Sequence, residues 1–320
     1  MPNYQGVWSL STQYQNASGW PKFVLTNPRA LFMGGENGSN LDVIDYIDIT
    51  STGNASDFGN LSDGVYGAMS VSSATRAVAS GGYDGANRLN VIQYVTIANT
   101  GNTTDFGDLS TGSEQGTGTG SSIRGLFQIG VQTNGDYVNT VEYITIASTG
   151  NATDFGDRTG EIAYGQDSAV SSPTRGIFSA GYDLVSGSAN IIDYVTISST
   201  GNATDFGDLT VARFGAGGAS SSTRGVIGGG SGPSNVMDYI TIASTGNATD
   251  FGNLTVAPIY VSGTSNGTRG VFGGGESGGA FLNVIGYITI ASTGDATDFG
   301  DLTTAKGRLT ATSGSHGGIA

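Results

Sequence analysis

The sequence predicts an all-β fold: a six-bladed β-propeller with four-stranded antiparallel blades, whose ring is closed by the C-terminal strand pairing in blade one. A repeat is the first observation behind this prediction. The motif Thr-Gly-Asn-Ala-Thr-Asp-Phe-Gly-Asp-Leu recurs with small changes, and its first Asp falls at Asp57, Asp105, Asp154, Asp205, Asp250 and Asp298. Regular spacing of this size indicates one supersecondary unit copied six times.

Composition is the second observation. Only 12% of the 320 residues are charged and 55 are glycine, whereas an average soluble domain has about 25% charged residues. Clusters rich in Val, Ile and Tyr alternate with runs of Gly, Ser, Thr and Asn. This composition is typical of short strands joined by tight turns.

The residues of one repeat predict its four strands in order. In the fifth repeat we expect a first strand of small residues over 213–222, a second over 223–230, a third over 235–244 and a fourth over 248–254. A loop joins the second and third strands, and a tight turn joins the third and fourth. Short successive strands joined in this way form an antiparallel meander.

The distribution of side-chain size is the third observation. Third strands such as 43–47 and 191–195 are nearly continuous apolar runs, which indicates burial on both faces. Small residues in the first two strands suit a crowded central axis, whereas Tyr and Phe suit the wide outer part of a wedge. The tail 307–315 matches a first strand, and blade one lacks one before Arg29. We therefore expect an N-terminal arm over 1–28 and a closed propeller over 29–320, without exposed sheet edges.

The repeat resembles the kelch repeat, which is about 50 residues long. The resemblance rests on a glycine pair that ends the second strand, a Tyr in the third strand and a large aromatic residue in the fourth. The glycine pairs are Gly34-Gly35, Gly81-Gly82, Gly229-Gly230 and Gly274-Gly275; the tyrosines are Tyr46, Tyr94, Tyr143, Tyr194, Tyr239 and Tyr287; the aromatic residues are Phe58, Phe106, Phe155, Phe206, Phe251 and Phe299. Kelch repeats usually have Trp at the last position, and the glycine pair is eroded in repeats three and four. The resemblance implies the fold and says little about function.

Charge and residue inventory exclude several classes of function. The net charge is −14, so we expect no nucleic-acid partner and no adsorption to an anionic membrane. No segment approaches ~18 consecutive apolar residues, so we expect no membrane insertion, and the N-terminus lacks the pattern of a signal peptide. The chain has no Cys and a single His, His316. We therefore expect no enzyme activity, no catalytic residue, no metal site and no cofactor.

Three sets of repeated polar residues have predicted structural roles. We expect each arginine that opens a second strand to pair with a repeat Asp or to cap a turn carbonyl, rather than to build an anion site. Two Asp three residues apart point to opposite faces of a strand, which disfavours calcium. The Asn-Ala-Thr segments match the glycosylation pattern, but Asn after Gly is favoured in tight turns for backbone reasons. The arginines are Arg29, Arg76, Arg124, Arg175, Arg224 and Arg269.

The loops that differ between repeats form the candidate recognition site. They connect strands two and three within a blade, and strand four to the next blade, so in a meander they emerge on one face. Variation confined to one face of a rigid scaffold favours recognition, and drift on unconstrained loops is the alternative. The predicted binding residues are Asn37, Tyr66, Tyr83, Asp84, Arg88, Asp136, Tyr137, Tyr164, Tyr182, Asp183, Tyr260 and Phe281.

The N-terminal arm contains both tryptophans of the chain. Two Trp side chains are seldom left without a packing partner. We therefore expect the arm to pack on the propeller or on another subunit. Its predicted attachment residues are Trp8, Tyr14 and Trp20.

The chain also resembles kelch-like propellers of bacteriophage tail fibres and virion appendages. The resemblance rests on the near-identical repeat Thr-Gly-Asn-Ala-Thr-Asp-Phe-Gly-Asp-Leu-Thr, the strand Thr-Arg-Gly-Val-Phe-Gly-Gly-Gly, the Trp-containing arm and the ending Ser-His-Gly-Gly-Ile. The resemblance implies a virion protein that is assembled in the host cytoplasm and bound to other virion proteins through its arm. The expected function is non-enzymatic: the variable face contacts a glycan or a protein on the host surface.

Two alternatives stay open from the sequence. One is a structural decoration or spacer that binds no ligand. The other is a glycan-binding or glycan-cleaving propeller of a secreted adhesin. Cleavage needs an acid–base pair of carboxylates in one pocket, and the candidates are Asp84, Glu161 and Asp183.

Overall fold

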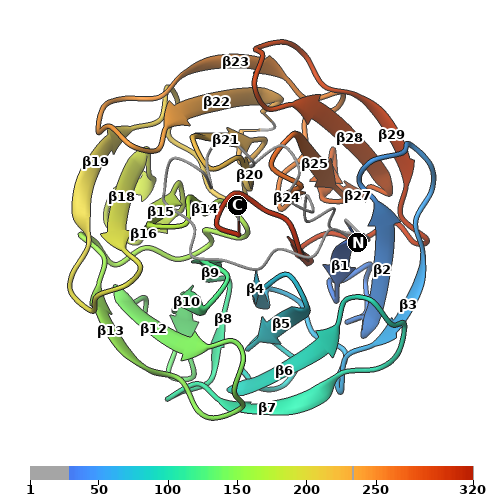
Figure 1. The fold of residues 1–320 in the computed structure, drawn as a ribbon, viewed down its shortest axis with the longest axis vertical. Coiled ribbons are helices and arrows are strands. Elements are labelled where there is room, and N and C mark those ends of the chain that lie inside the picture. The colour runs from blue at the N-terminus through green and yellow to red at the C-terminus, as the bar shows by residue number, and fades with distance from the viewer. Residues whose placement is uncertain (1–28, 233, 320) are drawn as a thin grey trace, which may run out of the picture.

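The computed structural model describes residues 29–232 and 234–319. These residues form six four-stranded antiparallel sheets arranged around a central axis (Figure 1). The predicted six-bladed propeller is therefore confirmed. The attachment residues Trp8, Tyr14 and Trp20 lie outside the described residues.

The first three blades are numbered from the sheet that contains the start of the described chain. Blade one consists of β30 (Thr310–Ser313), β1 (Arg29–Met33), β2 (Val43–Asp48) and β3 (Ser56–Asn60). Blade two consists of β4 (Met69–Ser72), β5 (Arg76–Ser80), β6 (Val91–Thr96) and β7 (Thr104–Asp108). Blade three consists of β9 (Thr117–Gly120), β10 (Arg124–Gln128), β12 (Thr140–Thr145) and β13 (Thr153–Asp157).

The other three blades follow the same order from the axis outward. Blade four consists of β14 (Val170–Ser171), β15 (Arg175–Ser179), β18 (Ile191–Thr196) and β19 (Thr204–Asp208). Blade five consists of β20 (Gly217–Ser220), β21 (Arg224–Gly228), β22 (Val236–Thr241) and β23 (Thr249–Asn253). Blade six consists of β24 (Ser262–Ser265), β25 (Arg269–Gly273), β28 (Val284–Thr289) and β29 (Thr297–Asp301).

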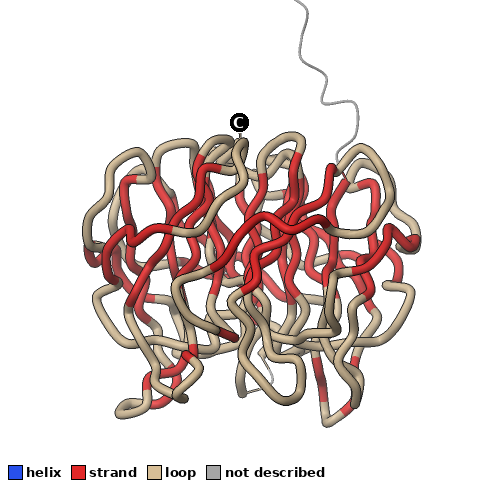
Figure 2. The backbone as a smooth tube through the Cα atoms, turned by 90° about the horizontal axis from the view of Figure 1, so that it is seen from below, coloured by secondary structure: helices blue, strands red, loops and turns tan. Residues whose placement is uncertain are grey.

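Among the described residues, three two-stranded ribbons lie in the loops between blades and in the loops between strands two and three. They pair β8 (Ser113–Glu114) with β11 (Val131–Gln132), β16 (Tyr182–Asp183) with β17 (Gly187–Ser188), and β26 (Glu276–Ser277) with β27 (Ala280–Phe281). Figure 2 shows these ribbons projecting from the face of the disc that lies opposite the C-terminus.

The strands are shorter than the sequence predicts. The expected first strand over 213–222 begins only at Gly217. Two features of the preceding residues explain the late start. Arg213 turns its side chain into the protein to meet Asp238, and Gly215 has a φ of 67°, which is incompatible with extended backbone.

The C-terminal strand closes the ring as predicted. β30 pairs antiparallel with β1, with Ala30 opposite Ser313 and Met33 opposite Thr310. Blade one is thereby built from both ends of the described chain (Figure 1). The closure stabilises the ring because opening it requires the loss of a complete strand pairing.

Six hydrophobic clusters fill the seams between neighbouring blades. One cluster joins Leu31 and Phe58 of blade one to Val95 of blade two, and corresponding clusters occupy the other five seams. In every blade the third-strand Tyr meets the fourth-strand Phe edge to face, with ring centroids 5.9–6.1 Å apart. The large rings therefore fill the outer wedge, as the distribution of side-chain size predicts.

The Thr-Gly-Asn turn fastens each blade to the preceding one. At the seam between blades six and one, the Gly53 amide donates to the Phe299 carbonyl oxygen at 2.8 Å. Asn54 Oδ1 accepts from the Asp301 amide at 3.1 Å. A Cβ on Gly300 would lie 2.4 Å from the Gly53 carbonyl oxygen. The same side-chain contact recurs at the other seams, with Asn102, Asn151, Asn202, Asn247 and Asp295 as acceptors.

The six repeated arginines cap carbonyl groups of the following blade. Arg175, for example, lies over the Tyr194 ring at 4.6 Å and donates to the Ile242 carbonyl oxygen at 3.0 Å. The other five arginines cap the residues Ile49, Ile97, Ile146, Ile197 and Ile290 in the same way. The predicted carbonyl capping is confirmed, and it explains why the arginines follow the six-fold symmetry.

Buried ion pairs join three of the six seams. Asp238 pairs with Arg213 at 2.9 Å, and neither side chain is exposed. Similar pairs join Asp45 to Lys306 at 3.1 Å and Asp193 to Arg158 at 2.9 Å. Burial lowers the pKa of the Arg213 guanidinium, and Asp238 opposes this effect. Sequence analysis did not predict these pairs.

Candidate recognition face

The variable loops share one face, which we call the mouth face. Their backbones meet through short antiparallel bridges that pair Tyr66 with Tyr83, Ala163 with Tyr182 and Ile259 with Glu276. Each bridge connects a segment between blades to a loop between strands two and three. The expectation that both loop sets emerge together is therefore correct, and Figure 2 shows the mouth face opposite the C-terminus.

A belt of backbone hydrogen bonds surrounds the axis beneath this face. Its six members occupy one repeat position, and their φ angles lie between 54° and 67°. They are Gly67, Gln115, Tyr164, Gly215, Tyr260 and Arg308. The amide of one member donates to the carbonyl oxygen of the preceding one at five of the six links. Three belt residues, Tyr164, Tyr260 and Arg308, contribute their side chains to the mouth.

Aromatic rings form an arc around most of the mouth. We call the set Tyr66, Tyr83, Tyr137, Tyr164, Tyr182, Phe214 and Tyr260 the aromatic arc. Within it, Tyr164 contacts Tyr137, Tyr182 and Phe214 at centroid distances of 5.8, 6.2 and 5.9 Å. Phe214 also contacts Tyr260 at 6.0 Å, and Tyr66 contacts Tyr83 at 5.5 Å. All seven side chains are half-buried, so each keeps part of its ring exposed.

Arg308 connects the two parts of the arc. Its guanidinium lies 4.3 Å from the Tyr260 ring centre and 5.4 Å from that of Tyr66. The guanidinium also pairs with Glu36 at 2.6 Å and lies 3.9 Å from Glu276. Burial would lower the pKa of Arg308, but Tyr260 and the two glutamates outweigh it and raise the pKa. Arg308 is therefore a fixed cation between two rings.

The arc has a gap at the seam between blades two and three. Here the belt position holds Gln115, preceded by Glu114, and Glu114 pairs with Arg88 at 2.9 Å. We call Arg88, Glu114 and Gln115 the polar notch. Among the described residues, no partner reaches Glu114 Oε2 or Gln115 Oε1, although both side chains are buried. Burial raises the pKa of Glu114, and Arg88 together with the neighbouring Gln115 side chain opposes this effect.

The structure brings half of the predicted binding residues into the arc: Tyr66, Tyr83, Tyr137, Tyr164, Tyr182 and Tyr260. Arg88 lies in the notch, and Phe281 is partly buried in β27 beside Gly307. Asn37 and Asp136 are exposed on hairpin tips and do not join the arc.

Asp84 and Asp183 instead hold their own hairpins. Asp84 accepts from the amides of Ala86 and Asn87, and Asp183 accepts from those of Val185 and Ser186. These backbone hydrogen bonds lower the pKa of both aspartates. Glu161 is exposed between blades three and four.

Sequence analysis missed Phe214 and Arg308 as members of the mouth, and it placed Glu114 in a variable segment of this face without selecting it as a binding residue. Phe214 and Arg308 were assigned to first strands, which in fact begin later at Gly217 and Thr310. A signal was available, because each belt residue follows the Asp of Asp-Phe-Gly by the same interval in every repeat.

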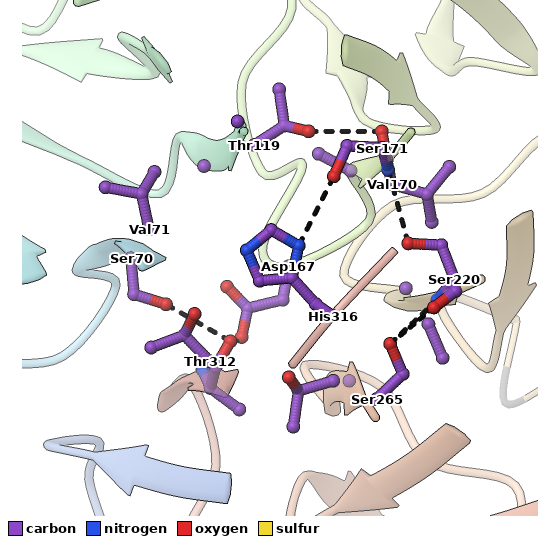
Figure 3. A pocket seen from close by; sticks show the side chains of 18 residues that line it. Ser70, Val71, Thr119, Asp167, Val170, Ser171, Ser220, Ser265, Thr312 and His316 are labelled. Atoms are coloured by element: carbon purple, nitrogen blue, oxygen red, sulfur yellow. Dashed lines mark hydrogen bonds between the residues drawn. The ribbon is translucent and has the colours of Figure 1, made fainter. Parts of the chain in front are cut away.

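Side chains occupy the central channel near both ends. On the mouth side, Asp167 accepts from the Thr310 hydroxyl at 2.7 Å and from the Ala311 amide at 2.6 Å across the axis. On the opposite side, His316 of the C-terminal tail lies near the Ser72 carbonyl and the Ser171 hydroxyl (Figure 3). The cavity between them measures about 40 Å³. This is room for little more than water, so the channel does not suit an extended ligand.

The described residues show no cluster of His, Cys, Asp or Glu that would hold a metal ion. The described part of the chain also contains no helix of the length and hydropathy that crossing a bilayer requires.

Comparison with known proteins supports the fold. No family model matches the chain, and no curated protein matches it. The solved structure of YjhT is similar: it is 10% identical, covers 85% of this chain and 98% of its own, and has a TM-score of 0.66. At this identity the similarity concerns the fold alone, a kelch-like six-bladed β-propeller.

Proposed function

We propose that this chain is a non-enzymatic virion protein that recognises a host surface through its mouth face. The aromatic arc is the observation that carries the proposal. The Tyr–Phe pairs, the six carbonyl-capping arginines and the Thr-Gly-Asn turns follow the six-fold repeat, whereas the arc and the notch break it. A departure from symmetry on one face of a rigid scaffold is where recognition residues are expected.

The chain direction supports this orientation. Arg29, where the described chain begins, pairs with Asp48 at the end of blade one that leads into the turn between strands three and four. This end lies opposite the mouth face. A propeller held through the segment before Arg29 would therefore present the arc outward, as a virion appendage requires.

A glycan-cleaving function is less well supported. A general acid needs a raised pKa to hold its proton near neutral pH. The pKa values of Asp84 and Asp183 are instead lowered by backbone hydrogen bonds, and the two aspartates stand on the hairpins of different blades. These side chains are therefore suited to holding turns.

Binding of the labelled protein to intact bacterial cells tests the proposal. The double variant Tyr182→Ala/Tyr260→Ala should bind at least about tenfold more weakly, because stacked tyrosines supply much of the contact energy of such surfaces. The control is Ile123→Ala, which truncates a side chain that is 67% exposed on the face opposite the mouth. Equal binding by both variants would contradict a recognition role for the arc.

Location is tested separately by antibody labelling. Labelled virions are the expected result. Labelled cell surfaces without virions would favour a secreted adhesin. Labelled virions whose protein binds no cell would favour a structural spacer.

A further inference from the structure

Three buried polar atoms of the polar notch have no hydrogen-bond partner among the described residues: the acceptors Glu114 Oε2 and Gln115 Oε1, and the donor Arg88 Nε. Glu114 and Gln115 are each 4% exposed, and no described residue donates to Glu114 Oε2 or Gln115 Oε1. The other carboxylate oxygen of Glu114 already binds Arg88. A buried acceptor without a partner is unfavourable unless a ligand or water supplies the donor.

The notch adjoins one end of the aromatic arc. The backbone N–H of Gln115 donates to the Gly67 carbonyl oxygen at 2.6 Å, which places Gln115 beside Tyr66. Arg88 lies 5.9 Å from the Tyr83 ring centre, and its backbone bridges to that of Tyr83. Two partly exposed rings therefore lie beside two buried oxygen acceptors that have no partner.

We propose that the notch and the Tyr66–Tyr83 end of the arc together bind a neutral, hydroxyl-rich sugar unit. The sugar hydroxyls donate to Glu114 Oε2 and Gln115 Oε1, and the apolar face of the sugar ring packs against a tyrosine. This inference rests on the proposed function and names the ligand class of the same face.

Charge favours a neutral ligand over an anionic one. Among the described residues of the mouth, both cations already pair with a carboxylate: Arg88 with Glu114 and Arg308 with Glu36. A carboxylate or sulfate ligand would therefore meet Glu114 and Glu36 without a free cation, on a chain with a net charge of −14. A neutral hydroxyl supplies the missing donor without this repulsion.

The position of the notch in the ring supports a specific role. Gln115 shares its positive φ with the other five belt residues, so its side chain rather than its φ sets this position apart. Corresponding positions hold Gly, Tyr or Arg. The belt bond that would join the Tyr164 amide to the Gln115 carbonyl oxygen is also the one link not formed. The seam between blades two and three thus departs from the repeat in both side chain and backbone.

Direct binding to defined oligosaccharides tests the proposal. The probes are immobilised neutral hexamers of glucose, mannose and galactose, with oligogalacturonate as the anionic probe and chitosan hexamers as the cationic probe. The variants are Glu114→Gln, which replaces the free acceptor by an amide, and Gln115→Asn, which withdraws the amide oxygen but suits the backbone conformation. The control is Glu161→Gln, the same chemical change at an exposed site.

We expect the wild type to bind at least one neutral hexamer. Both notch variants should bind it at least about tenfold more weakly, whereas Glu161→Gln should remain within about twofold. Thermal melting checks that each variant is folded. The proposal is overturned if the wild type binds none of the neutral hexamers or binds only the charged probes. It is also overturned if both notch variants are folded and bind the neutral hexamer as strongly as the wild type.

Cell binding separates this inference from the proposed function. If periodate oxidation of cell-surface glycans abolishes binding, both stand. If binding survives periodate but is lost after protease treatment, recognition stands and the sugar inference fails.

Discussion

The same repeat builds the outer rim and the mouth face, but equivalent positions hold nearly the same residues at the rim and different residues at the mouth. At the rim, Arg175 over Tyr194 and Asn54 against Asp301 have equivalents in the other blades. At the mouth, one repeat position holds residues as different as Gly67, Tyr260 and Arg308. The comparison shows that seam geometry restricts residue choice at the rim, because a side chain there must serve two blades at once. The mouth side chains are free of that restriction.

The buried seam pairs offer the largest test of this difference. Arg213→Met leaves Asp238 without its cation in a fully buried site, and we expect a loss of about 3–5 kcal/mol in the free energy of unfolding. The double variant Arg213→Met/Asp238→Leu should recover most of the loss, because no unpaired charge remains. Urea unfolding measures both. Equal losses in the single and double variants would refute the charge explanation.

The channel carboxyl should make stability depend on pH. Burial raises the pKa of Asp167 to about 7, against about 3.9 in the unfolded chain. The folded protein therefore keeps a proton that the unfolded chain releases. This contribution to stability is fully present below about pH 4 and is lost as the pH rises to about 7. Each unit of pKa difference corresponds to about 1.4 kcal/mol, so the effect amounts to a few kcal/mol.

Comparison of the wild type with Asp167→Asn isolates this effect. Burial lowers the pKa of His316 to about 4, so its contribution has the opposite sign and is lost as the pH falls from about 6.5 to 4. Both proteins contain His316, and its contribution cancels in the difference. The unfolding free energy of the wild type minus that of Asp167→Asn should decrease as the pH rises from about 4.5 to about 8. A constant difference would contradict the raised pKa.

Two tyrosine truncations compare the regions directly. Tyr194→Ala removes the ring that packs against Phe206 and carries Arg175, and we expect a loss of about 2 kcal/mol in stability with unchanged cell binding by the folded protein. Tyr182→Ala removes a ring of the arc and should weaken cell binding severalfold. Denaturant titration and cell-binding curves for both variants supply the data. If Tyr194→Ala lost cell binding and Tyr182→Ala kept it, the recognition residues would lie at the rim rather than at the mouth.

The smallest expected effect lies at the seam between blades five and six. Gly286 stands where other blades have Asp45, Asp193 or Asp238, and a Cβ there would lie 3.5 Å from Thr255 Oγ1 without a close contact. Gly286→Ala should therefore stabilise the protein by about 0.5–1 kcal/mol. Gly300→Ala is the matched opposite, because its Cβ would lie 2.4 Å from the Gly53 carbonyl oxygen and should destabilise. Urea unfolding of each variant measures the change in the free energy of unfolding. A lower value for Gly286→Ala than for the wild type would show that this seam requires the glycine.

The sequence by itself determined the number of blades, their four strands and the closing strand. These features depend on local pattern and on a regular interval, both of which a single chain displays. It also indicated the mouth face, because Tyr66, Tyr164 and Tyr260 lie in segments that vary between repeats. Only the tertiary structure decided which side chains meet there. Arg308 lies between Tyr66 and Tyr260, and ring closure brings these distant segments together.

The seams show the same division. The repeated Asn and Arg were identifiable because each position has a local pattern, but Arg213 and Lys306 were not, because each pairs with an Asp of another strand only when blades pack. The polar notch is the clearest case. Its two acceptors lack partners because no donor of the folded protein reaches them. The order of residues along the chain does not show which donors lie near an acceptor after folding.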